Sequence, residues 1–183
     1  MTPTAVPPTA PGGARTLVAG VGNVFLGDDG FGVETARRLA REELPAGVEV
    51  ADVGIRGVHL AYQLLDGYDT LVLVDATARG GAPGTLYLIE AGTPGTGTPE
   101  GTGPAGEAGE VPLDGHRMSP DAVLALLGTL CATTGATPPR HTYVVGCEPA
   151  RLDESLELSP QVAAAVPEAV RMVAGLVRQE AGV

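Results

Sequence analysis

The chain has 183 residues, of which 44% are apolar but only 3% aromatic, and it carries a formal net charge of −11. This length suits a single globular domain whose core is built mainly from Val, Leu and Ala. The acidic balance, with no run of basic residues, argues against nucleic acid and against an anionic membrane surface as binding partners.

The N-terminal segment, residues 1–14, is rich in Pro, Thr, Ala and Gly and is predicted to be a disordered tail. It lacks the apolar core of a signal peptide, and no apolar run in the chain approaches the length of a membrane span. The two cysteines, Cys131 and Cys147, have no CxxC spacing, which favours neither a disulfide framework nor a zinc knuckle. We therefore expect a cytoplasmic protein with one folded domain over residues 15–183.

Strand and helix patterns alternate through the first half of this domain. A short apolar run at 16–21 predicts a buried strand, which is followed by a glycine-bearing turn and a helix at 31–43. The alternation continues with a strand at 48–53, a helix at 58–65 and a strand at 70–75. The last of these runs is apolar throughout, which is typical of a parallel strand covered on both faces.

A fourth strand is predicted at 85–90, before a change in composition. Residues 91–110 are rich in Gly, Thr, Pro and Glu and are predicted to form a flexible surface loop. Periodicity returns with a helix at 120–130, which Ser119 is placed to cap, and with a last strand at 141–147.

Two prolines divide the C-terminal segment. Pro160 is predicted to open a short helix, and Pro167 is predicted to break it and to start a second helix that runs to about residue 179. The whole pattern predicts an open three-layer α/β/α sandwich with a mostly parallel central sheet of about five strands.

Acidic side chains stand at or near the ends of four predicted strands: Asp28, Asp29, Asp52, Asp75 and Glu148. In open α/β sheets, ligands bind in the crevice beyond the carboxyl ends of the strands, so we expect these acids to converge. Converging carboxylates repel one another unless a cation joins them at some stage of the cycle. The alternative is that Asp and Glu serve only as turn and cap residues at these positions.

One histidine, His116, lies at an Asp-Gly-His turn shortly before the helix that starts at Pro120. It can complete a site of carboxylate and imidazole ligands, which suits nickel or zinc, unless it is a solvated loop residue. We expect structural roles for His59 and His141. The chain has no HExxH, HxxEH or GxSxG motif, so neither an ordinary zinc protease nor a serine hydrolase is indicated.

The glycines Gly20 and Gly22 follow the first strand, which invites a dinucleotide-binding interpretation. The third glycine of that fingerprint is replaced by Phe25, and the acidic pair Asp28 and Asp29 would repel a pyrophosphate. A bound nicotinamide or flavin cofactor is therefore not expected.

The same segment combines a Gly-x-Gly-Asn motif, an acidic pair and a second Gly-x-Gly, at Gly20, Gly22, Asn23, Asp28, Asp29, Gly30 and Gly32. In this combination the chain resembles the hydrogenase maturation endopeptidases, peptidase family M52. The similarity continues in unbroken order over about residues 16–180, through Asp52 to Gly57, Asp75, His116, Gly146 to Pro149, and Leu158 to Pro160.

The resemblance implies an endopeptidase that removes the C-terminal extension of a [NiFe]-hydrogenase large-subunit precursor after nickel insertion. It implies that Asp29, Asp75 and His116 form the catalytic site and recognise nickel that the substrate itself carries, so that no metal is permanently bound. Asp52 matches an acid implicated in cleavage or substrate positioning, although the family's usual Asp-Gly-Gly-Thr sequence is Asp-Val-Gly-Ile here. Gly54 and Arg56, on the same loop, are candidates for contact with the substrate.

A second class of function stays open. The same acids and histidine would suit a non-catalytic protein that binds or delivers nickel for metalloenzyme assembly. The sequence is compatible with a monomer and does not identify which hydrogenase is the partner.

Overall fold

The computed structural model describes residues 13–92 and 119–182. Its strands and helices alternate along the chain, with these bounds: β1 (Thr16–Val21), the 3-10 turn η1 (Gly27–Gly30), α1 (Phe31–Leu39), β2 (Val48–Gly54), α2 (Gly57–Gln63), η2 (Leu64–Asp66), β3 (Thr70–Ala76), β4 (Leu86–Ala91), α3 (Pro120–Thr134), β5 (His141–Cys147) and α4 (Pro160–Glu180). The predicted tail at 1–14 and loop at 91–110 lie mostly outside the described residues and stay predictions.

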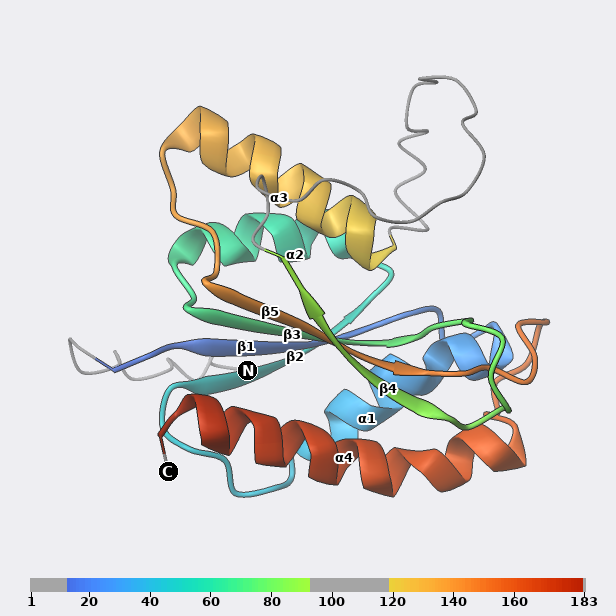
Figure 1. Cartoon of the computed structure of the whole chain (residues 1–183). Helices are drawn as coiled ribbons and strands as arrows, with labels where there is room; N and C mark the ends of the chain where they lie inside the picture. Colours follow the sequence, from blue (N-terminus) through green and yellow to red (C-terminus); the bar gives the residue numbers. More distant parts are fainter. Residues whose placement is uncertain (1–12, 93–118, 183) are drawn as a thin grey trace, which may run out of the picture.

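The five strands form one sheet in the order β2-β1-β3-β5-β4. The first four are parallel, and β4 runs antiparallel to β5 at the edge. Helices α1 and α4 cover one face of the sheet, while α2 and α3 cover the other (Figure 1). The predicted three-layer sandwich with a mostly parallel sheet is therefore confirmed.

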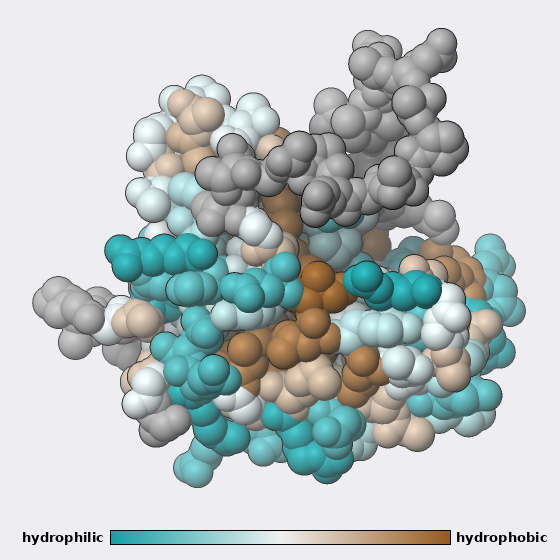
Figure 2. Space-filling model, in the orientation of Figure 1, coloured by the Kyte–Doolittle hydropathy of each residue, from teal (hydrophilic) through white to brown (hydrophobic). Residues whose placement is uncertain are grey.

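Alternation along the strands divides the core into two layers. On β1, Val18 packs toward α1 and α4, while its neighbours Leu17 and Ala19 pack toward α2 and α3. All three are fully buried, as expected for a strand covered on both faces. The edge strand β4 is less covered, and its Leu88 is exposed. Hydrophobic residues gather at the centre of the face that β4 crosses (Figures 1 and 2).

The prediction of two C-terminal helices is wrong, because α4 continues through Pro167 as a single helix. A proline inside a helix loses one backbone hydrogen bond, which costs about 3 kcal/mol. Here Pro167 lies on the exposed side, and buried residues such as Val166 and Ala169 continue the packing on both sides of it. That continuous contact offsets the lost hydrogen bond.

The other helix boundaries differ by a few residues from the prediction. Helix α1 ends at Leu39 rather than at residue 43, and α3 continues to Thr134. Gly135 ends α3 in a left-handed conformation, at φ +76°, and its N–H donates to the Cys131 carbonyl at 2.9 Å. Among the described helices, none is both long enough and apolar enough to cross a membrane.

Candidate functional site

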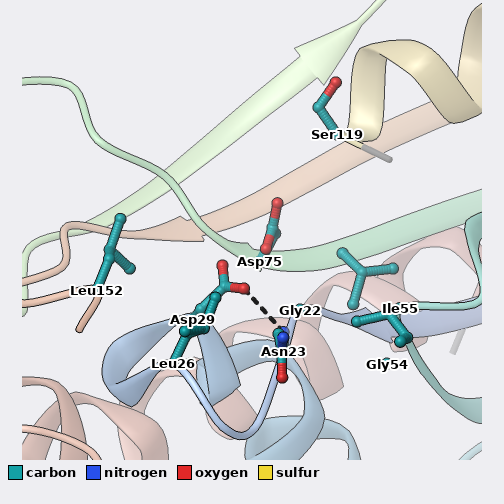
Figure 3. Close-up of a pocket in the computed structure, with 10 residues that line it drawn as sticks. Gly22, Asn23, Leu26, Asp29, Gly54, Ile55, Asp75, Ser119 and Leu152 are labelled. Atoms are coloured by element: carbon teal, nitrogen blue, oxygen red, sulfur yellow. Dashed lines mark hydrogen bonds between the residues drawn. The ribbon is translucent and has the colours of Figure 1, made fainter. Parts of the chain in front are cut away.

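A cavity of about 360 Å³ opens at the carboxyl ends of the parallel strands. The ends of β1, β2 and β3 line it, together with the loops after β1, β2 and β5 and with Ser119, the N-cap of α3. Among the described residues, two that line it are charged: Asp29, on η1, and Asp75, near the end of β3. Their side chains lie close together in the view of the cavity (Figure 3).

Ionisation of both carboxyl groups of this acid pair is unfavourable. Burial and, second, the nearby charge of Asp29 raise the pKa of Asp75 to about 8, and a backbone hydrogen bond from Ala76 only partly opposes this. The carboxylate of Asp29 accepts a hydrogen bond from the Asn23 N–H at 2.8 Å. The cavity therefore holds two carboxyl groups whose simultaneous ionisation is unfavourable without a cation.

Gly22 lets the acid pair approach the end of β1. Its φ of +125° is unfavourable for other residues, and a side chain there would collide with the backbone oxygen of Asp29. The same added carbon would lie 3.7 Å from Oδ1 of Asp75. The glycine predicted from the Gly-x-Gly motif is thus required by the close packing of the acid-bearing turn.

Asp28 does not join the cavity, contrary to the expectation that all the strand-end acids converge. It is fully buried and accepts hydrogen bonds from the N–H groups of Ala150, Arg151 and Ser159, at 2.8, 3.0 and 2.6 Å, and from the Ser159 hydroxyl. Burial alone would raise the pKa of Asp28, but these hydrogen bonds outweigh it and hold the pKa below its usual value. Asp28 thus holds the loop between β5 and α4 in place through these hydrogen bonds.

Glu148 is also turned away from the cavity. It is only 6% exposed and accepts hydrogen bonds from the backbone of Arg79 at 2.8 Å, the backbone of Gly80 at 3.2 Å and the hydroxyl of Tyr87 at 2.9 Å. The hydrogen bond from Arg79 is the main reason that its pKa is lowered. The prediction of convergence is therefore wrong for Glu148, which fastens the loop between β3 and β4.

The predicted site residues at the end of β2 and on the loop after it lie in two different places. Gly54 lines the cavity, at φ +58°, and its carbonyl accepts the Gly22 N–H at 3.0 Å. Asp52 instead forms an ion pair with Arg37 at 2.8 Å, outside the cavity. Arg56 folds back, and its guanidinium donates to the carbonyls of Asp52 at 2.6 Å and Val53 at 3.2 Å.

His116, the third predicted ligand, lies outside the described residues. Over residues 13–92 and 119–182, no three His, Cys, Asp or Glu side chains are grouped so that they could hold a metal ion. The described part of the site thus contributes a pair of carboxylates. Both cysteines are buried core residues, and burial raises the pKa of the Cys147 thiol to about 11.

Several cavity residues were not predicted as part of the site, among them Ile55, Ser119 and Leu152. Ser119 does cap α3 as predicted, by accepting the Ala122 N–H at 3.3 Å. A signal for Ile55 was available, because it follows Gly54 directly. None was available for Leu152, since its loop has no periodicity and is placed by distant contacts with Asp28.

Known proteins resemble this chain over nearly its whole length. The family described as hydrogenase maturation protease matches residues 33–93. The hydrogenase expression/formation protein HupD of Rhodobacter capsulatus is 33% identical over 163 residues, which are 86% of this chain and 70% of that protein. The hydrogenase 2 maturation protease of Escherichia coli is also 33% identical, over 90% of this chain and 92% of the relative.

The fold comparison agrees with these sequence matches. The solved structure of the hydrogenase maturating endopeptidase HybD from Escherichia coli superimposes with a TM-score of 0.69 and 28% identity, covering 91% of this chain and 93% of that one. Together with the acid-lined cavity at the strand ends, these similarities show that the chain belongs to the hydrogenase maturation proteases and is an endopeptidase, a peptide-bond hydrolase.

Proposed function

We propose that the chain removes the C-terminal extension of a [NiFe]-hydrogenase large-subunit precursor, in the cytoplasm, once nickel has been inserted into that precursor. The observation that carries this proposal is the half-buried acid pair, Asp29 and Asp75, which lines one cavity. Burial, and then the neighbouring charge of Asp29, raise the pKa of Asp75 to about 8. A cation supplied by the substrate relieves that repulsion. Binding is then favoured only for a precursor that already holds its metal.

His116 completes the proposed recognition site as the third ligand to the substrate's nickel. It precedes Ser119, which lines the cavity, by only three residues. Three residues of chain span at most about 11 Å, so the covalent connection supports a place for the imidazole near the acid pair. Two carboxylates and one imidazole suit a borderline divalent ion.

The nickel of the substrate, held at this site, can polarise the scissile carbonyl or lower the pKa of a water molecule. The side chains that line the cavity orient the precursor, and the bound precursor excludes bulk water from it. We assign Asp52 and Arg56 to positioning, because both hold the turn at Gly54 through contacts outside the cavity. Gly54, which is half-buried and lines the cavity, is placed to contact the substrate.

The test compares purified large-subunit precursor with and without inserted nickel, each mixed with this chain and followed by the shift in mass. We expect shortening of the nickel-loaded form alone. Equal cleavage of both forms would refute nickel-gated recognition. No cleavage of either, together with one nickel ion bound tightly per isolated chain, would instead favour a nickel-delivery protein.

A further inference from the structure

Large hydrophobic side chains that face solvent are concentrated at one edge of the molecule. In the described part of the chain six are exposed: Phe25, Ile55, Tyr62, Leu88, Leu152 and Leu156. Four of these, which we call the apolar rim, lie on the loops after β1, β2 and β5: Phe25, Ile55, Leu152 and Leu156. Exposed hydrophobic residues that gather in this way mark a surface that contacts another molecule.

The apolar rim surrounds the acid pair. Ile55 and Leu152 line the same cavity as Asp29 and Asp75, and the close-up shows them on opposite sides of the two carboxylates (Figure 3). They are 40% and 51% exposed, so a large part of each residue is available for contact.

The remaining two members of the rim extend this surface outward. Phe25 is 66% and Leu156 76% exposed. Their loops are joined, because the Phe25 carbonyl accepts the Ser155 N–H at 3.0 Å and Leu26 forms a strand-like bridge with Ser155. The loops that carry Phe25 and Leu156 are therefore held together by backbone contacts, next to the loop of Leu152.

Hydrogen bonds join both walls of the cavity to the segment between β1 and α1, which carries Asp29. Leu152 follows Arg151, whose N–H donates to Asp28 at 3.0 Å, and Asp28 is adjacent to Asp29. On the other side, Gly54 precedes Ile55 and accepts the Gly22 N–H. A surface that is ordered before binding loses less conformational entropy when its partner arrives.

The chemistry of the rim defines its partner. Between Ile55 and Leu152 the charged groups are two carboxylates, in a chain of net charge −11. The complementary face carries a positive centre, surrounded by uncharged, apolar side chains. A strongly basic peptide does not fit this pattern, because the exposed side chains on both sides of the acid pair, Ile55 and Leu152, are aliphatic and offer no further negative charge.

We infer that the apolar rim is the docking surface for the folded large-subunit precursor, and that it contacts apolar side chains around the precursor's metal site. This inference rests on the proposed function. It adds that the affinity for the precursor comes mainly from the apolar rim, while the acid pair discriminates between precursors with and without the cation.

The experiment measures the binding of nickel-loaded precursor, immobilised through its N-terminus, to the full-length chain and its variants. We expect Leu152→Ser and Ile55→Ser each to raise Kd about tenfold, which corresponds to about 1.4 kcal/mol. Leu88→Ser is the matched control: Leu88 is also 51% exposed but lies on β4 and does not line the cavity, so its Kd should stay within about twofold of wild type. Thermal unfolding checks that all variants are folded.

The outcomes separate the two proposals. If wild type cleaves the precursor but the rim variants bind as tightly as it does, or if Leu88→Ser weakens binding equally, the docking surface is refuted and the proposed function stands. If wild type binds without cleaving, and the rim variants still bind tenfold more weakly, the docking surface stands and the proposed function fails.

Discussion

The protonation of Asp75 makes the stability of this protein depend on pH in an unusual direction. Its pKa is raised from 3.8 to about 8, first by burial and then by Asp29. Between these two values the folded state binds more protons than the unfolded state, so the free energy of unfolding falls as the pH rises from about 4 to 8. Asp75→Asn removes the titrating group and should remove this loss.

The size of the effect follows from the shift in pKa. At about 1.4 kcal/mol per pKa unit, the full shift corresponds to roughly 6 kcal/mol, which is an upper bound. Water in the open cavity screens the charge, so we expect a gain of about 2 kcal/mol for Asp75→Asn at pH 8 and almost none at pH 4.

The assay is urea unfolding of metal-free protein at several pH values between 4 and 8.5. Asp66→Asn, at an exposed aspartate, should follow the wild-type curve. Asp29→Asn should flatten the pH dependence in part, because it removes the neighbouring charge that contributes to the shift. If the Asp75→Asn and wild-type curves run parallel over this range, the account of a strained acid pair is refuted.

Three further predictions concern the neighbours of this pair. Asp28→Asn should lower the free energy of unfolding by about 3 kcal/mol at pH 7, because four donors, two of them in buried hydrogen bonds, lose a charged acceptor. Since the pKa of Asp28 is lowered, this deficit should shrink as the pH falls below about 4 in urea titrations. Gly22→Ala should cost about 3 kcal/mol in the same assay, whereas Gly67→Ala, also at positive φ but with no atom within 4 Å of the added carbon, should cost about 1 kcal/mol. Asp29→Asn and His116→Ala should each reduce kcat/KM for precursor processing at least about 100-fold without lowering the melting temperature, and normal processing by both variants would contradict the site assignment.

The sequence predicted the strands because their signal is local. Thr70–Ala76 is an apolar run whose length and composition alone favour a buried parallel strand, and all five predicted strands are present. The error at Pro167 has a different origin. Whether a proline ends a helix depends on the packing around it, and the buried contacts of α4 form with residues far away in the chain.

The acid pair could be predicted from the sequence, but the orientation of Asp28, which is adjacent to Asp29, could not. Asp28 and Asp29 are adjacent on the 3-10 turn η1, where successive side chains point about 120° apart. One of them must therefore face away from the cavity. The turn's orientation decides which one, and that orientation depends on the loop around Ser159, whose hydrogen bonds with Asp28 span 131 residues.

The sheet order explains why the acids after β1 and β3 meet while the others do not. Neighbouring β1 and β3 occupy the middle of the sheet, and the chain leaves β1 through α1 on one face but enters β3 from α2 on the opposite face. Connections that diverge in this way leave a crevice at the carboxyl ends of adjacent strands. Asp29 and Asp75 reach into that crevice, whereas β2 lies at the edge and its Asp52 is captured by Arg37 on α1. The topology thus brings two of the five strand-end acids together in the crevice, while the other three stabilise the surrounding loops.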